Sequence, residues 1–351
     1  MAEENQTTHK RRVRYSGKYP KKFEEKYKEL QPEKYKDTIE HVIKKGNTPA
    51  GMHISIMVNE ILDFLKIQPG ETGFDATLGY GGHTKAMLEC LKGQGHIYAT
   101  DVDPEESART KKRLADLGFG EDMLTVKLQN FCTIDEIAKE VGGFDFILAD
   151  LGVSSMQIDN PKRGFSFKVD GPLDLRLNQE AGISAAERLD TISRDELAGM
   201  LYENSDEPYC EELAKAITDE IRKGNRIDTT TKLRNIIEKT LDFLPEKEKK
   251  DTIKKTCQRT FQALRIDVNR EFEVLYEFME KLPDALKPGG RAAILTFHSG
   301  EDKLVKKALK EGYRAGIYAD YAKDVIRPSA QECAQNGRAR STKMRWAIKA
   351  E

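Results

Sequence analysis

One segment, residues 74–84, constrains the fold of this chain more than any other. It reads Phe-Asp-Ala-Thr-Leu-Gly-Tyr-Gly-Gly-His-Thr, so an apolar run ends at Asp75 and three glycines follow. The residues that come next, 84–91, are expected to form a helix. A strand, a tight glycine turn and a helix N-terminus in this order are typical of nucleotide-like cofactor sites in α/β proteins.

Predicted strands and helices alternate before and after a long interruption. Strands are expected at residues 96–101, 124–128, 144–150 and 291–297, and residues 343–348 alternate like an edge strand. Helices are expected between them, which is the spacing of βαβ units around a parallel sheet. After Asp150 the rhythm stops and polar helical segments follow. We therefore predict an α/β, Rossmann-like sheet in residues 49–157 and 256–351, an inserted helical domain in 158–255, and a basic N-terminal extension in 1–48.

The composition narrows the class of protein. The five cysteines are scattered and form no Cys-x-x-Cys pair, so neither a disulfide scaffold nor a zinc site is expected, and we expect no metal. No apolar run reaches the ~18–20 residues of a membrane span. The N-terminus also lacks the apolar region of a secretion signal. We therefore expect a cytoplasmic protein that does not bind membranes.

Positive charge is concentrated near the two ends, although the net charge is only −1. Residues 10–22 contain seven Lys or Arg and no acid, with aromatic side chains between them, and residues 338–349 are also basic. Such segments suit contacts with the phosphates and bases of RNA. The alternative interpretation of the N-terminal arm is a solvated tail.

The acids around the glycine turn indicate the type of cofactor. Asp75, Asp101 and Asp150 come at the C-terminal ends of predicted strands, the edge at which such sheets bind ligands. The turn lacks the third glycine of a dinucleotide motif, which disfavours a nicotinamide oxidoreductase. Three carboxylates also suit the cationic S-adenosyl-L-methionine better than a pyrophosphate. Each aspartate has a local alternative role, as a helix N-cap or turn former.

Seven stretches of the sequence identify a family. They are residues 53–60, 76–83, 150–159, 163–176, 259–269, 288–299 and 338–341, and they occur in order over about residues 50–349. In these stretches the chain resembles the MraW/RsmH family of small-subunit (16S) ribosomal RNA cytosine-N4 methyltransferases. Three departures suggest a divergent member of the family or a paralogue: Gly300 stands where the family usually has leucine, residues 311–325 look short, and the first 50 residues are additional.

The resemblance implies a class I methyltransferase sheet with an inserted substrate-recognition domain, and N4-methylation of a cytosine near the decoding site. The partner would be ribosomal RNA within the assembled small subunit; the oligomeric state is left open, with a homodimer as one candidate. The family's cofactor contacts correspond to Gly81, Gly82, His83, Asp101, Phe131, Asp150 and Gln157. Phe131 either stacks on adenine or is a core residue. The alternative functions are methylation of another RNA or DNA cytosine, or a non-catalytic role in ribosome assembly.

Three residues are predicted to act at the target base. Asp150 would border both cofactor and base, with Ser154 and His298 close by; His298 alternatively packs or caps a helix. The exocyclic amine of cytosine is a poor nucleophile, so an acceptor near its N–H and in-line positioning should supply the acceleration. RNA contacts are predicted at Arg163, Phe165, Phe167, Arg176, Arg259, Arg265, Arg338 and Arg340. Phe165 and Phe167 would either stack an unpaired cytosine or anchor their own loop.

Overall fold

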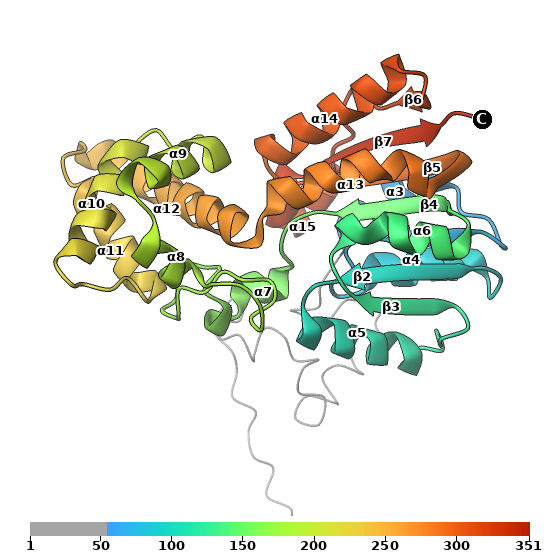
Figure 1. Cartoon of the computed structure of the whole chain (residues 1–351), viewed down its shortest axis with the longest axis horizontal. Helices are drawn as coiled ribbons and strands as arrows, with labels where there is room; N and C mark the ends of the chain where they lie inside the picture. The colour runs from blue at the N-terminus through green and yellow to red at the C-terminus, as the bar shows by residue number, and fades with distance from the viewer. Residues whose placement is uncertain (1–54) are drawn as a thin grey trace, which may run out of the picture. The chain divides into compact units, whose positions relative to one another are not determined.

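The computed structural model describes residues 55–351, so the predicted basic arm lies outside the described residues. Residues 55–351 contain a seven-stranded sheet in the order β3-β2-β1-β4-β5-β7-β6 (Figure 1). The strands are β1 Thr72–Asp75, β2 His96–Asp101, β3 Leu124–Leu128, β4 Phe144–Asp150, β5 Leu286–Thr296, β6 Tyr318–Tyr321 and β7 Lys343–Lys349. The predicted α/β sheet is confirmed.

The strand pairing is parallel on one side of the sheet and antiparallel on the other. β1 lies between β2 and β4 and pairs parallel with both, and β4 continues the parallel pairing to β5. β7 is antiparallel to β5 and to β6. The prediction of an edge strand at 343–348 is therefore wrong, because β6 covers the second side of β7. The strand β6 was not predicted; it has four residues, and its two middle residues are exposed.

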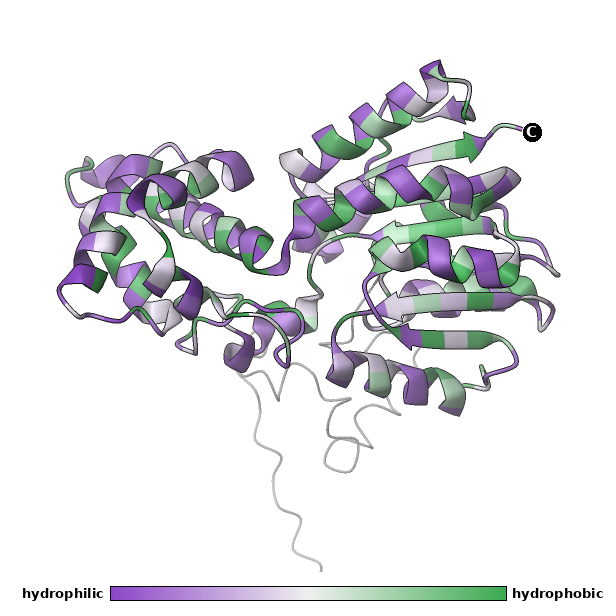
Figure 2. Cartoon of the chain, viewed as in Figure 1, coloured by the Kyte–Doolittle hydropathy of each residue, from purple (hydrophilic) through white to green (hydrophobic). Residues whose placement is uncertain are grey.

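Helices cover both faces of the sheet, which explains why its central strands are apolar on both sides. Along β4, Ile147 and Ala149 share an apolar cluster with α6 Ile134–Val141, α13 Glu271–Ala285 and α14 Ser299–Arg314. Phe146 and Leu148 face the other way, toward α3 Val58–Leu65, α4 Gly82–Leu91 and α5 Pro104–Asp116. Figure 2 shows apolar central strands beside helices with strongly polar surfaces. Within residues 55–351, every helix is too short or too polar to cross a membrane.

The helical insert forms a lobe with its own apolar core. The helices α8 Ala185–Thr191, α9 Arg194–Ser205, α10 Cys210–Arg222, α11 Thr230–Thr240 and α12 Glu246–Asn269 all contribute to it. The predicted boundary at residue 255 falls inside α12, and Phe261 and Leu264 still belong to the lobe core. The lobe therefore ends later than predicted, at Arg270, whose left-handed φ of 51° separates α12 from α13.

Candidate functional site

The three predicted carboxylates lie at one edge of the sheet, because β1, β2 and β4 are parallel neighbours. Asp75 is 1% exposed and accepts hydrogen bonds from the hydroxyl of Thr84 at 2.6 Å and the backbone N–H of Thr77 at 3.1 Å. Burial raises the pKa of Asp75. Asp75 thus anchors the first turn of α4, which is the local alternative that its sequence position left open.

Asp101 closes two turns at the end of β2. Its Oδ2 accepts the backbone N–H of Gly79 at 2.8 Å, and its Oδ1 accepts that of Asp103 at 2.9 Å. Burial raises the pKa of Asp101 to about 6, although both hydrogen bonds act to lower it. A carboxylate oxygen accepts more than one hydrogen bond, so both oxygens retain capacity for a ligand hydroxyl. This arrangement suits a carboxylate that holds ribose hydroxyls.

Two glycines of the turn between β1 and α4, Gly81 and Gly82, leave no room for a side chain. Gly81 has a φ of 74°, and a Cβ at this position would lie 2.7 Å from the methyl group of Thr110. A Cβ at Gly82 would lie 2.0 Å from the hydroxyl of Ser55. The two glycines therefore let α5 and residue 55 pack closely against the turn. A cofactor contact at these positions would be made by backbone atoms.

His83 and Asp150 face one another at the same edge. His83 Nδ1 lies 3.4 Å from Asp150 Oδ2, and His83 Nε2 lies 2.9 Å from the carbonyl of Ile56. Because a carbonyl only accepts, Nε2 carries the proton in this contact. The other oxygen of Asp150, Oδ1, is buried and has no partner among the described residues. Burial raises the pKa of Asp150 to about 6, Asp75 and Glu301 add to the rise, and His83 opposes it.

Two further predicted cofactor residues, Phe131 and Gln157, and the predicted catalytic residue Ser154 have partners within the protein. Phe131 starts the 3₁₀ turn Phe131–Thr133 after β3 and packs edge-on against Phe278, with ring centroids 5.1 Å apart. Ser154 caps α7 Ser155–Asp159 by accepting the backbone N–H of Gln157 at 3.1 Å. The Gln157 amide accepts the N–H of Ser154 at 3.0 Å and donates to Asp103 at 3.0 Å. Both ends of the Gln157 amide are therefore engaged in protein contacts.

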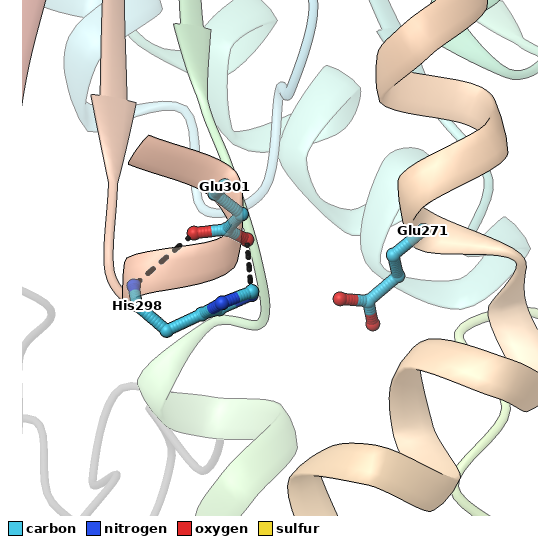
Figure 3. Close-up of side chains that lie close together, drawn as sticks. All are labelled: Glu271, His298 and Glu301. Atoms are coloured by element: carbon cyan, nitrogen blue, oxygen red, sulfur yellow. Dashed lines mark hydrogen bonds and ion pairs between the residues drawn. The ribbon is translucent and has the colours of Figure 1, made fainter. Parts of the chain in front are cut away.

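His298 belongs to an ion-pair cluster at the start of α14. Its Nε2 lies 3.1 Å from Glu301, and Glu271 points toward the same ring from the start of α13 (Figure 3). One ligand atom from each of these three residues lies within 4.8 Å of the others. Both oxygens of Glu271 accept from Arg265 at 2.8 Å, so a metal ion would compete with the guanidinium. Burial acts to raise the pKa of Glu301, but His298 and Arg265 outweigh it and the pKa is lowered.

Gly300 makes room for an aromatic ring. A Cβ at this position would lie 2.5 Å from the ring of Phe272, which stands edge-on to His298 with ring centroids 5.7 Å apart. Phe272, Gly300 and residues of α9 and α14 line a pocket of about 340 Å³. The missing side chain therefore shapes the neighbourhood of the predicted catalytic histidine.

The structure separates the predicted RNA contacts by accessibility. Arg163 and Phe165 are 6% and 9% exposed, so RNA cannot reach either side chain in this structure. Arg163 instead pairs with Asp103, and Phe165 belongs to the lobe core. Phe167 packs edge-on against Phe261, with ring centroids 5.8 Å apart, as expected of a loop anchor. Three of the remaining arginines are partly buried and ion-paired: Arg176 with Asp174, Arg265 with Glu271, and Arg338 with Asp159. Arg259 is partly buried, and Arg340 is exposed.

Three residues of the site were not predicted from the sequence: Asp103, Glu271 and Glu301. Asp103 caps α5 and lies between the two predicted halves of the site, bonded to Asp101 on one side and to Arg163 on the other. An aspartate followed by proline at the first helical position is a sequence signal for a helix start, and it would have identified the cap. Nothing in the sequence signals the long-range partner.

Comparison with known proteins places the chain in a family. The model of the MraW methylase family matches residues 50–350. The chain is 88% identical over 351 residues to ribosomal RNA small subunit methyltransferase H 1 of Agathobacter rectalis, covering 100% of both proteins. It is 70% identical over 348 residues to the protein of that name from Lachnoclostridium phytofermentans, covering 99% of this chain and 95% of the relative. It is 35% identical over 301 residues to ribosomal RNA small subunit methyltransferase H of Acidobacterium capsulatum, covering 85% and 98%. The chain therefore belongs to the MraW methylase family.

Proposed function

We propose that this protein transfers the methyl group of S-adenosyl-L-methionine to N4 of a cytosine near the decoding site of small-subunit ribosomal RNA. The observation that carries the proposal is the buried, unpartnered Oδ1 of Asp150 at the ligand-binding edge of the sheet. A buried polar atom without a partner is uncommon and calls for an explanation, and at the ligand-binding edge of the sheet a bound ligand supplies one. The relatives that match nearly the whole chain are named ribosomal RNA small subunit methyltransferases, which supports small-subunit ribosomal RNA as the substrate. A ribosomal substrate also agrees with a cytoplasmic location.

The residues present fit S-adenosyl-L-methionine. The carboxylate of Asp101 would accept the ribose hydroxyls, and the backbone of the turn at Gly81 and Gly82 would lie beside the cofactor. The ionised Asp150 would face a positively charged ligand, which offsets the cost of burying its charge. When bound, the cofactor supplies an electrophilic methyl group.

The base would be activated by an acceptor and by positioning. Asp150 Oδ1 would accept a hydrogen bond from the exocyclic amine of cytosine and take up the proton that the amine loses on methylation. The hydroxyl of Thr77 accepts the backbone N–H of Asp150 at 2.8 Å and so fixes the end of β4 that carries this carboxylate. His298 would approach the base from the next strand, where Glu301 lies 3.1 Å from its Nε2. An unpaired cytosine in the assembled subunit costs least to extrude into such a site.

The decisive test uses the purified protein and small ribosomal subunits from a strain that lacks the gene. Incubation with S-adenosyl-L-methionine should produce N4-methylcytidine in the subunit RNA, detected by nucleoside mass spectrometry. The same measurement before incubation must show no N4-methylcytidine, because a second methyltransferase in that strain would otherwise have modified the subunits already. Cofactor binding without methylation of subunits, free RNA or DNA would contradict the enzymatic proposal and favour a role in ribosome assembly.

Cofactor affinity should depend on the ionisation of Asp101. Because burial raises its pKa to about 6, the carboxylate is mostly ionised at pH 7.5 and mostly protonated at pH 5. A protonated carboxyl group is the weaker acceptor for ribose hydroxyls, so we expect the dissociation constant to rise by about tenfold between these pH values. Calorimetry with S-adenosyl-L-methionine measures this change. Asp101→Asn should bind weakly at both pH values, and an unchanged pH profile in this variant would assign the effect to Asp150 instead.

A further inference from the structure

A single buried carboxylate, that of Asp103, joins the cofactor edge of the sheet to the loop that leads into the lobe. Its Oδ1 accepts the backbone N–H groups of Glu105 and Glu106, at 3.1 and 3.2 Å, and so caps α5. Its Oδ2 accepts Gln157 Nε2 at 3.0 Å and Arg163 Nη1 at 2.6 Å. Four donors thus converge on one side chain that is 2% exposed.

The loop side of this junction depends on Arg163. Its second terminal nitrogen donates to the carbonyls of Arg176 at 3.1 Å and Leu177 at 2.6 Å, so the guanidinium ties both ends of the loop 163–177 together. The backbone N–H of Leu177 donates to the side chain of Asn269, the last residue of α12, at 2.8 Å. The contacts therefore continue from Asp103 through the loop to the end of the longest helix among those described in the lobe.

The cofactor side depends on Asp101. The backbone N–H of Asp103 donates to Asp101 Oδ1, so the cap of α5 and the carboxylate proposed to hold the ribose belong to one hydrogen-bonded turn. A ligand whose hydroxyls bind Asp101 would stabilise the ionised carboxylate, and with it this turn. Asp103 would then be held in the orientation that receives Arg163.

We propose that Asp103 and Arg163 are positioning residues that couple occupation of the cofactor site to the ordering of loop 160–177. This inference rests on the proposed binding of S-adenosyl-L-methionine at Asp101. Arg163 acts through Asp103 and touches neither cofactor nor RNA, which explains why an arginine in a basic, loop-rich segment is buried. Coupling of this kind is reciprocal, so an ordered loop would also tighten cofactor binding.

Hydrogen exchange of the whole protein, with and without saturating S-adenosyl-L-methionine and without RNA, tests the coupling. In the wild type the cofactor should slow exchange of peptides covering residues 160–177 by about fivefold or more, within the usual range of coupling factors. Arg163→Met should lose this slowing. Asp103→Asn should lose this slowing too while keeping the cap of α5, because asparagine is an equally good N-cap. When the amide oxygen of asparagine caps the helix, its NH₂ group faces the donors of Gln157 and Arg163 and cannot accept from them. Both variants should still bind the cofactor by calorimetry.

Arg176→Met is the matched control, because this arginine lies in the same loop but pairs locally with Asp174 and has no bond to Asp103. It should retain the slowing caused by the cofactor. Slowing that persists in both Arg163→Met and Asp103→Asn would overturn the coupling, as would a wild type that binds the cofactor without any change in loop exchange. If Arg163→Met fails to fold, Asp103→Asn and the wild type decide the outcome. Absence of cofactor binding to the wild type would instead overturn the proposed function.

Discussion

Replacing Asp150 with asparagine is expected to reduce the methylation rate at saturating cofactor by about 100-fold or more while making the folded protein more stable. The rate falls because the amide cannot accept the amine proton, and loss of a general base typically costs about 10²–10⁴-fold. Stability rises because the neutral amide avoids burying a charge. Its NH₂ group can also donate to His83 Nδ1, which lies opposite Asp150 and whose proton sits on the other nitrogen.

The stability gain should depend on pH. Because burial raises the pKa of Asp150 to about 6 from its ordinary value of 3.8, the folded protein holds this proton more tightly than the unfolded chain. The stabilisation from the bound proton is present below pH 3.8 and is lost as the pH rises through about 6. Asp150→Asn should therefore gain up to about 3 kcal/mol at pH 8 and about half of that at pH 5.

Urea unfolding of the variant and the wild type at both pH values measures the gain in stability. The difference between the two proteins separates the contribution of Asp150 from those of its neighbours Asp75, His83 and Glu301, which both proteins share. Asp145→Asn is the control, because Asp145 lies at the opposite end of β4 and is paired with Lys287 at 2.8 Å. This control should keep its activity and lose up to about 1 kcal/mol of stability. An Asp150→Asn protein that methylates normally would remove Asp150 from the reaction.

Replacing Gly164 with alanine should destabilise the lobe-entry loop by more than about 3 kcal/mol, because conformational strain and a backbone clash add together. Gly164 has a φ of 73°, and its added Cβ would lie 2.2 Å from the carbonyl oxygen of Pro172 and 3.0 Å from the backbone nitrogen of Asp174. Neither neighbour is the tip of a flexible side chain. The loop would therefore have to move, and with it the carbonyl of Arg163 that accepts the N–H of Leu175 at 3.1 Å.

Gly182→Ala provides a matched comparison within the same insert. Gly182 has nearly the same φ, 70°, but a Cβ there would have no neighbour within 4 Å. We expect a loss of only about 1 kcal/mol, the cost of the left-handed conformation alone. Urea denaturation of both variants separates strain from clash. Equal losses would show that loop 163–177 yields to the added methyl group.

The parts of the fold that local pattern specifies were predictable. The strands ending at Asp101 and Asp150 and the glycine turn between β1 and α4 lie where the sequence placed them, because apolar runs, strand-end acids and glycines are local signals. The end of the lobe was not predictable in this way. Residues 246–255 of α12 are mostly exposed and its buried side chains begin at Thr256, so the change from polar to apolar sequence at residue 255 falls inside one helix. The chain changes direction only at Arg270.

The site was predicted less well because residue type does not reveal burial. An arginine and a phenylalanine in a basic, glycine-rich loop look like RNA contacts, yet Arg163 and Phe165 are interior residues. The acid that neutralises Arg163 is Asp103, which lies 60 positions earlier, beyond β3, α6 and β4. Pairing across that separation is a property of the assembled sheet, and no periodicity in either segment encodes it.

The left-handed residue at Arg270 has a consequence for how this architecture can diversify. The lobe leaves the sheet after Asp150 and rejoins it at Glu271. Glu301 lies near both residues, because its charge helps to raise the pKa of Asp150 and one of its oxygens lies within 4.8 Å of an oxygen of Glu271. Excising residues between these two points would leave β4, α13 and β5 as an ordinary βαβ unit. The lobe is thus an insertion whose two ends, at Asp150 and Glu271, both lie near Glu301. The lobe can therefore change in length or sequence while Asp150, Glu271 and the cofactor-binding edge of the sheet stay in place.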